Sequence, residues 1–298
     1  MRKHPVMFGM LILLILGVSF YFFFYKAGLY SGKNKSFSLK DKIGVVHVDG
    51  VITDSIPITE QLDEFGNDDS IVAVVLRVDS PGGGVAASQE IYDAVIELKK
   101  KKKVVASMGS VAASGGLLVA CSADKIVANP GTITGSISAI MQFANFEGLL
   151  KKVGVKSSVV KSGQYKDIGS PLREMTPEEK VIVQDLVDDI YNQFIDVIVK
   201  ERKLTREKVI EIADGRVFSG RRAKELGLVD YLGDMTFAAK LAGKMAGRTG
   251  EYELVYPGKK RFSVFDYFLE NAASKISSSF KEKMESTSGL NYIYYPGR

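Results

Sequence analysis

Short runs of β-branched residues alternate with amphipathic stretches along this chain from residue 43 onward. The runs predict strands at residues 43–48, 71–78, 104–107, 125–128 and 156–160. Helices are predicted near residues 57–65, 86–100, 145–153, 176–202, 205–213, 219–226 and 234–246, with one more starting at Ala113. This alternation is typical of α/β proteins with largely buried strands. The start at 176–202 is the best marked, because Thr176 and Glu179 have capping-box spacing around Pro177.

No Pro-, Gly- or Ser-rich linker divides the chain after its N-terminal part. We therefore predict one domain at residues 43–250, preceded by a separate segment at 1–42 and followed by a tail at 251–298. In the tail, residues 264–285 predict an amphipathic helix, and Leu290–Pro296 is rich in tyrosine. This aromatic terminus could dock on a membrane, on a neighbouring molecule or in a groove of the domain, or it could be loosely ordered.

Residues Met7–Tyr25 form an uncharged run of 19 residues. As a helix this run spans about 28 Å, close to the hydrocarbon thickness of a bilayer. It ends in aromatic residues at Phe20–Tyr25 rather than in a small-residue cleavage site. We predict an uncleaved single-pass anchor with a juxtamembrane linker at residues 1–42. Lysines lie on both sides of the run, so charge by itself leaves the orientation open.

The net charge of +5 resides in the anchor segment, because residues 1–42 carry seven Lys and Arg and one Asp. The rest of the chain is nearly neutral. Its lysine cluster at Lys99–Lys103 ends a predicted helix, which argues against nucleic-acid binding. One cysteine, Cys121, and two histidines are too few for an intramolecular disulfide or an ordinary zinc site, and we expect no metal or cofactor.

Ser114 lies among small residues in the segment Met108–Gly116, and Lys166 follows 52 residues later in a glycine-containing loop. Of the two histidines, His4 precedes the apolar run and His47 lies in a predicted core strand. A Ser-His-Asp triad is therefore disfavoured, and a serine nucleophile here needs another base. The pattern suggests a Ser–Lys hydrolase.

The glycines of Asp79–Gly84 are predicted to form a loop where a strand ends and a helix begins. Backbone N–H groups exposed at such a junction suit a developing oxyanion. Gly82, Gly84 and Ala87 also match a dinucleotide-binding fingerprint, but no acidic residue ends the next strand and no P-loop lysine follows. A purely structural glycine turn is the other alternative.

Five segments, in this order along the chain, resemble the motifs of the SppA-type signal peptide peptidases. They are Asp79–Gly84, the Ser114 segment, Thr134–Ser136, Lys161–Pro171 and Asp214–Gly220. The resemblance covers roughly residues 43–247. It implies a Ser–Lys serine protease with a fold like that of Clp protease and crotonase, a repeated β-β-α superhelix, after an N-terminal transmembrane helix.

Position by position, the resemblance implies that Ser114 is the nucleophile, Lys166 the general base and Ser136 the hydroxyl that orients the lysine. The backbone N–H groups of Gly83 and Gly115 would form the oxyanion hole. The family also implies a homo-oligomeric ring or dome, and a cell-membrane protein with a cytoplasmic N-terminus and an extracytoplasmic catalytic domain. Remnant signal peptides would be the substrates.

A lysine acts as a base only when it is neutral, which requires its pKa to fall from about 10.4 to about 7–8. Burial has to supply most of that shift. A carboxylate beside the lysine would oppose it, so we expect Asp167 to point away from Lys166, toward backbone donors or another subunit. Lys161, nearby in the same loop, is not the expected base.

Three other functions compete with a signal peptide peptidase. A protease for membrane proteins would use the same residues, and the sequence does not separate the two. A catalytically silent membrane scaffold would have no need of Ser114, Lys166 and Ser136 together. A crotonase-type enzyme for acyl-CoA would share the oxyanion glycines, but a membrane anchor argues against it.

Overall fold

The computed structural model describes residues 13–22, 41–258 and 291–293 of the chain. The chain divides into two compact units, Met1–Lys40 and Asp41–Arg298. In the first unit, residues 13–22 are helical. None of the described helices is long and apolar enough to cross a bilayer. Most of the expected anchor and the expected helix at 264–285 lie outside the described residues.

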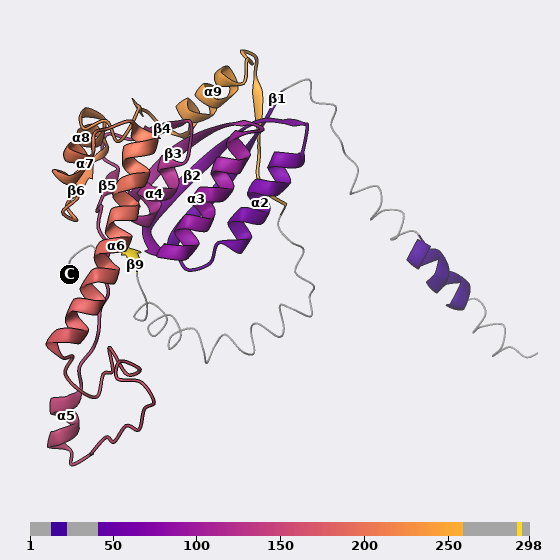
Figure 1. Cartoon of the computed structure of the whole chain (residues 1–298). Coiled ribbons are helices and arrows are strands. Elements are labelled where there is room, and N and C mark those ends of the chain that lie inside the picture. The colour runs from indigo at the N-terminus through magenta and orange to yellow at the C-terminus, as the bar shows by residue number, and fades with distance from the viewer. Residues whose placement is uncertain (1–12, 23–40, 259–290, 294–298) are drawn as a thin grey trace, which may run out of the picture. The chain divides into compact units, whose positions relative to one another are not determined.

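The second unit is a mixed α/β structure built on one sheet (Figure 1), so the expected α/β class is confirmed. Its strands are β1 (Asp41–Ile52), β2 (Ile71–Gly84), β3 (Lys103–Ala113), β4 (Lys125–Ala128), β5 (Ile133–Gly135), β6 (Val217–Ser219), β7 (Tyr231–Leu232), β8 (Tyr252–Val255) and β9 (Asn291–Ile293). The helices are α2 (Ile56–Asn67), α3 (Val85–Lys99), α4 (Gly115–Cys121), α5 (Glu147–Lys152), α6 (Pro177–Arg202), α7 (Arg206–Ile210), α8 (Gly220–Glu225) and α9 (Met235–Met245).

The sheet runs in the order β6-β5-β3-β2-β1-β8, with β4 beside the first part of β3 and β7 beside β4. Its pairs are parallel except for β5 with β6 and β2 with β9. Strand β3 changes partner along its length. Residues 105–108 pair with β4, and residues 111–113 pair with β5. The last residues of β3, directly before Ser114, therefore pair with β5 and not with β4.

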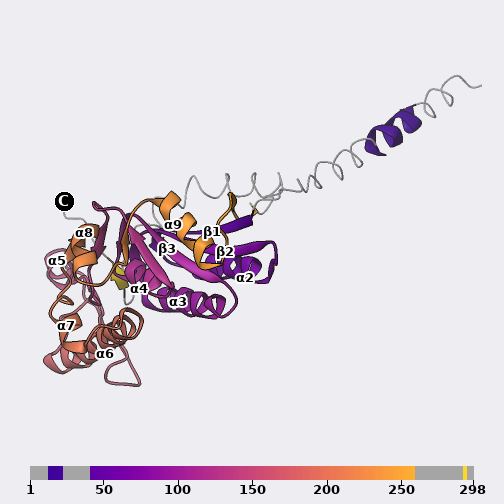
Figure 2. The same ribbon diagram turned by 90° about the horizontal axis from the view of Figure 1, so that it is seen from above.

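The two faces of the sheet are covered by different helices, as Figure 2 shows from above. Alternate residues of each central strand point to opposite faces. In β2, Val74 and Leu76 join the larger core with α2, α3, α4 and α6, whereas Ala73 and Val75 join a smaller core with α9. Both faces are apolar, which explains the continuous β-branched runs in the sequence.

Two expected elements are wrong. Residues 79–84 were expected as a loop, but they continue strand β2 as far as the start of α3. The run at 156–160 was expected as a strand, but it lies outside any helix or strand, and Val160 is fully exposed. A β-branched run becomes a strand only where a neighbouring strand offers backbone partners, and none lies beside this one in the described residues.

Helix α6 begins as the sequence predicts. The Thr176 hydroxyl accepts a hydrogen bond from the Glu179 N–H at 3.2 Å, and the Glu179 carboxylate accepts one from the Thr176 N–H at 2.9 Å. These two bonds form a capping box. The second half of the helix packs into the larger core through Ile190, Phe194 and Ile198. Its first turns extend beyond the sheet toward α5 (Figure 1).

Candidate active site

Ser114 stands at the sharp turn between strand β3 and helix α4. Its φ is +53° and its ψ is −119°, a backbone conformation that a residue with a side chain rarely adopts. Its backbone N–H donates to the carbonyl of Gly135 at 2.8 Å. The residue is only 1% exposed, and its Oγ has no hydrogen-bond partner in the described part of the chain. Strain and an unpaired buried hydroxyl together are typical of a functional residue.

Ser136 lies beside Ser114 because the strands that precede the two serines are neighbours. Strands β3 and β5 run parallel, and Ala113 pairs with Gly135. Each serine is therefore the first residue after one of these two paired strand ends. Ser136 is also buried and also has a positive φ, +52°. Its N–H donates to the Arg216 carbonyl at 2.8 Å.

The glycines expected at the oxyanion hole meet directly. A methyl group added to Gly115 would lie 3.3 Å from the backbone nitrogen of Gly83 and 3.3 Å from Cα of Gly82. A methyl group on Gly83 would lie 2.1 Å from the carbonyl oxygen of Ile52 in β1. Both positions thus require glycine for space. The backbones of Gly83 and Gly115 converge next to Ser114.

Lys166 lies apart from these residues. Its side chain is exposed in the segment between α5 and α6, where its N–H donates to the Gly163 carbonyl at 3.2 Å. It forms no hydrogen bond with Ser114, whose Oγ is unpartnered. The structure therefore brings together Ser114, Ser136, Gly83 and Gly115 but leaves Lys166 elsewhere.

Asp167 does not pair with Lys166, in keeping with the sequence expectation, but its partners differ from those expected. Arg173 donates two hydrogen bonds of 2.9 Å to its carboxylate, and Lys161 forms an ion pair with it. Arg173 also binds Glu179, at 2.5 and 2.7 Å. These charge-assisted bonds to Arg173 lower the pKa of Asp167 well below its usual range and that of Glu179 to about 2.

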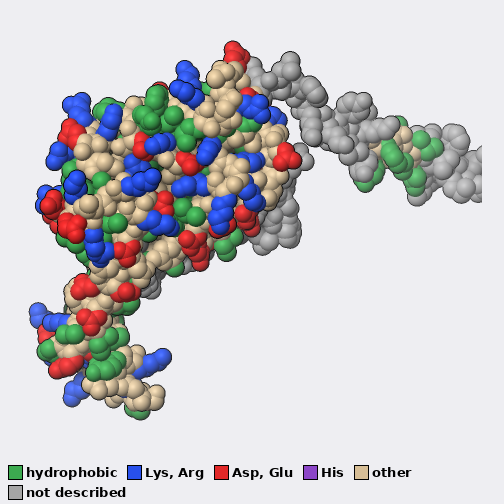
Figure 3. Space-filling model, turned by 45° about the horizontal axis from the view of Figure 1, so that its top comes forward, with side chains coloured by type: hydrophobic (Ala, Val, Ile, Leu, Met, Phe, Trp, Pro, Cys, Tyr) green, Lys and Arg blue, Asp and Glu red, His purple; other side chains and the backbone are tan. Residues whose placement is uncertain are grey.

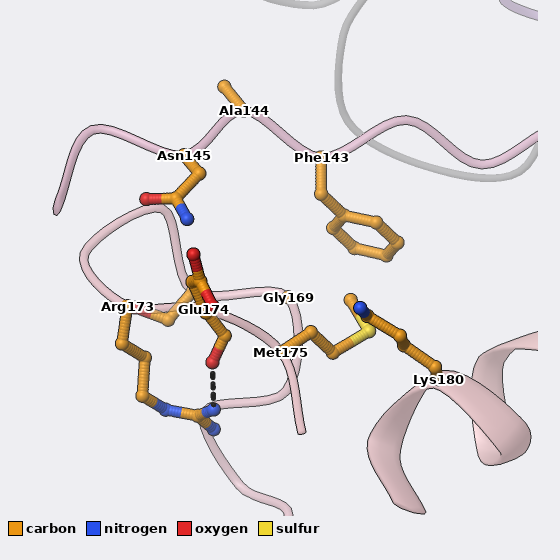
Figure 4. A pocket seen from close by; sticks show the side chains of 9 residues that line it. Phe143, Ala144, Asn145, Gly169, Arg173, Glu174, Met175 and Lys180 are labelled. Atoms are coloured by element: carbon orange, nitrogen blue, oxygen red, sulfur yellow. Dashed lines mark hydrogen bonds between the residues drawn. The ribbon is translucent and has the colours of Figure 1, made fainter. Parts of the chain in front are cut away.

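Residues 143–182 form what we call the arm: α5, the segment after it and the start of α6. The Phe146 N–H donates to the Pro171 carbonyl at 2.7 Å, which ties α5 to that segment. A pocket of about 310 Å³ lies within the arm. Figure 4 shows Phe143, Met175 and Lys180 around it, with Arg173 bonded to the Glu174 carbonyl. This pocket belongs to the arm rather than to the serine site.

Three supporting contacts were missed at the level of sequence. The Asp79 carboxylate accepts a hydrogen bond from the Val111 N–H at 3.0 Å, and the Thr134 hydroxyl donates to the Ala112 carbonyl at 2.6 Å. Asp79 and Thr134 belong to two of the motifs named above, but the sequence by itself assigned no role to either side chain. Ser88 is buried and donates to the Gly84 carbonyl at 2.9 Å. Nothing in its sequence context marks it.

His47, the other possible base, is exposed although the residues on either side of it in β1 are buried. Its Nδ1 is 3.2 Å from the carboxylate of Asp49. The prediction of a strand is confirmed, but the histidine is not a core residue.

The chain resembles proteases of bacteria in its sequence. A family model described as peptidase family S49 matches residues 96–248, and a Clp protease model matches residues 36–133. A protein of Synechocystis named as a protease is 53% identical over 175 residues, which cover 59% of this chain and 63% of that protein. A protein of Enterococcus faecium named for signal peptide peptidase SppA is 39% identical over 174 residues, 58% of this chain and 51% of that protein.

Protease 4 of Haemophilus influenzae is 33% identical over 254 residues, which cover 81% of this chain and 40% of that protein. The chain thus spans about two fifths to three fifths of the length of these relatives. The S49 model covers half of the chain, including Ser114, Ser136 and Lys166. The chain belongs to peptidase family S49.

Proposed function

We propose that this protein is a serine endopeptidase with Ser114 as nucleophile, Lys166 as general base and Ser136 as the hydroxyl that orients the lysine. One observation carries the proposal. The buried Oγ of Ser114 has no partner in the described part of the chain, and Ser114 lies on a strained turn where the backbones of Gly83 and Gly115 approach each other. A hydroxyl held without a hydrogen bond is available to a base that is brought to it.

The reaction follows from these groups. The neutral amine of Lys166 takes the Ser114 proton while Oγ bonds to the peptide carbonyl carbon. The resulting oxyanion accepts hydrogen bonds from Gly83 and Gly115, each such donor being worth roughly 10²–10³ in rate. Collapse breaks the C–N bond, and the leaving amine takes the proton from Lys166. Water then hydrolyses the acyl-enzyme by the same steps.

Lys166 has to be brought to Ser114, and we propose that a second copy of the chain brings it. Lys166 is adjacent to Asp167, which is held through Arg173 to Glu179 near the start of α6. From Glu179 to Phe194, where α6 packs into the core, the helix rises about 22 Å. The arm thus lies beyond the serine site of its own chain (Figure 1). Contact with a neighbour would also bury the exposed amine, as a neutral base requires.

Apolar side chains on the arm support this assembly. Figure 3 shows hydrophobic side chains on the protruding part of the arm, among charged side chains. The exposed ones are Phe143, Phe146, Leu149, Val153, Val155, Val159, Val160, Tyr165, Leu172, Val181 and Ile182. A cluster of this size is more than scattered exposed residues, and such clusters mark contact surfaces. We propose a homo-oligomer, a ring or dome, in which the arm contacts a neighbouring copy.

We further propose that residues 1–42 anchor the protein in the cell membrane, with a cytoplasmic N-terminus and an extracytoplasmic catalytic domain. We also propose that the catalytic domain has the repeated β-β-α superhelix of Clp protease and crotonase. Apolar peptides, remnant signal peptides above all, would be the substrates, in line with the name of the Enterococcus faecium relative. Quality control of membrane proteins is a second candidate, since an anchored protease meets those substrates too.

The test is complementation in detergent between full-length Ser114→Ala and Lys166→Ala variants, assayed on an apolar signal-sequence peptide. Each variant alone should lose at least about 10³-fold in kcat/KM. Mixed and reassembled variants should regain activity, because some sites pair an intact Ser114 with an intact Lys166. Ser110→Ala and Lys156→Ala are the matched controls and should cleave like the wild type.

Other outcomes are equally informative. An active wild type whose inactive variants never complement would place both residues in one chain. A folded wild type with no cleavage at all would favour the catalytically silent scaffold.

A further inference from the structure

Strand β3 bulges relative to its neighbour β2 shortly before it reaches Ser114. Regular pairing ends at Val78 with Met108 and resumes at Ser80 with Ala112. Between these two pairs β2 has one residue and β3 has three. The bulge therefore shifts the register of the two strands by two residues, which in regular strands correspond to about 7 Å.

This shift determines which glycine of β2 lies level with the start of α4. Counted onward from the pair of Ser80 with Ala112, Gly83 is level with Gly115. These are the two residues whose backbones approach each other beside Ser114. Without the bulge, Gly83 would be level with a residue before the nucleophile. Bulges next to active sites commonly redirect a side chain in this way.

The Asp79 side chain binds the backbone of the bulge. Asp79 is the single β2 residue opposite it, and its carboxylate accepts a hydrogen bond from the Val111 N–H at 3.0 Å. A methyl group added to Gly109 would lie 2.5 Å from the carboxylate carbon of Asp79 and 2.6 Å from its Oδ2. A side chain at position 109 would therefore displace the carboxylate.

Two buried threonines bind the same part of β3 through its carbonyl groups. The Thr132 hydroxyl donates to the Gly109 carbonyl at 2.7 Å, and the Thr134 hydroxyl donates to the Ala112 carbonyl at 2.6 Å. The threonines thus supply donors to the bulge, and Asp79 supplies an acceptor.

We propose that Asp79 is a positioning residue for the nucleophile: its carboxylate holds the bulge of β3 and thereby keeps Ser114 in register with Gly83. The inference rests on the proposed function, because it gives Asp79 a part in that reaction. Asp79 acts through the backbone and transfers no proton. The bond to Val111 needs an oxygen acceptor at this position, so a neutral amide oxygen should replace the carboxylate.

Asp124 provides a matched control, because its carboxylate accepts a hydrogen bond from the Val104 N–H at 2.9 Å, near the start of the same strand. Full-length Asp79→Ala, Asp79→Asn and Asp124→Ala are assayed in detergent on an apolar signal-sequence peptide. Asp79→Ala should lower kcat by about 10²-fold with little change in KM, because a displaced nucleophile weakens the transition state. Asp79→Asn should restore most of the lost kcat, and Asp124→Ala should cleave like the wild type.

Two kinetic results would overturn the proposal. Equal kcat in Asp79→Ala and Asp124→Ala would mean that the bond to Val111 only stabilises the strand. A loss in Asp79→Asn as large as in Asp79→Ala would mean that the charge matters and the acceptor does not.

Hydrogen exchange separates this inference from the proposed activity, because it needs no cleavage. It is measured for the same substitutions in a Ser114→Ala background. Asp79→Ala should accelerate exchange at residues 109–113 by at least about tenfold, as expected when a protecting bond is lost. Asp124→Ala should accelerate it only near residue 104, and Asp79→Asn should keep the protection. This pattern supports the role of Asp79 even if the wild type cleaves no peptide and the proposed function fails. Unchanged exchange in Asp79→Ala would overturn the inference and leave the proposed function standing.

Discussion

At the scale of single residues, the serine site depends on a side chain that does no chemistry. Ser88 of α3 is buried, and its Oγ donates to the Gly84 carbonyl. The same Oγ lies 2.5 Å from where a methyl group on Gly115 would be. Ser88 therefore lies between Gly84 and the start of α4, and we expect its hydroxyl to help keep the spacing of the two proposed oxyanion donors.

Replacing Ser88 by alanine should lower kcat by about tenfold and leave KM nearly unchanged, because misplaced donors weaken only transition-state binding. Ser122→Ala is the control, since its buried hydroxyl donates to the Val119 carbonyl at the far end of α4. Both variants should lose about 1 kcal/mol of stability in denaturant unfolding. Equal kcat in the two variants would mean that Ser88 is only structural.

At the scale of elements, Arg173 joins the Lys166 segment to helix α6. It binds Asp167 on one side and Glu179 on the other. Glu179 is also the capping-box residue of α6, so one carboxylate serves both the helix start and the loop. The order of the Lys166 segment therefore depends on the start of α6.

Acid should release this clamp. The bonds to Arg173 hold the pKa of Glu179 at about 2 in the folded chain, below its ordinary value near 4.5. A lowered folded pKa contributes stability that is complete above the unfolded pKa and is lost as the pH falls through the folded one. Hydrogen exchange of residues 161–180 should accelerate as the pH falls from about 4 toward 2, after correction for intrinsic rates. In Arg173→Gln, exchange should already be fast at pH 7, and protection equal to the wild type would contradict the clamp.

The cap of α6 makes a separate prediction. Thr176→Ala removes the side chain that accepts from the Glu179 N–H and should cost about 1 kcal/mol. Thr205→Ala removes the matching cap at α7, whose bond to the Lys208 N–H is longer, at 3.4 Å. Denaturant unfolding should show the larger loss for Thr176→Ala. Equal losses would indicate that the capping box adds nothing beyond a single cap.

At the scale of the whole molecule, the described chain separates an apolar arm from a nearly complete serine site. The contact with a second copy that we propose would cover the apolar surface of the arm and would supply the base to the serine site. The interface should therefore be tested apart from catalysis.

Val160→Asp places a charge on the fully exposed apolar tip of the arm. Burying that charge would be costly, so the oligomer should dissociate, and activity should fall with it. Light scattering of the detergent-solubilised protein measures the mass. Ile210→Asp, at an exposed position on α7, is the control and should keep the wild-type mass. An unchanged mass in both variants would exclude this surface from the interface.

The sequence predicted what depends on local patterns. Buried β-branched runs predicted the central strands, and Thr176 and Glu179 predicted the start of α6, because periodicity and capping act over a few residues. The run at 156–160 shows the limit of this reasoning. Its composition favours a strand, but a strand needs a partner that only the tertiary structure supplies.

The site divides in the same way. The residue types and their spacing pointed to Ser114, Lys166 and the glycines of 79–84, and the resemblance to SppA-type peptidases added Ser136 and Gly115. Only the tertiary structure decided that Ala113 and Gly135 pair, so that the two serines meet, and that Lys166 lies on an arm. Only the tertiary structure placed the C-terminal strand on Gly82–Gly84. These relations join residues far apart in the chain, and backbone pairing between distant segments leaves no local pattern in a sequence.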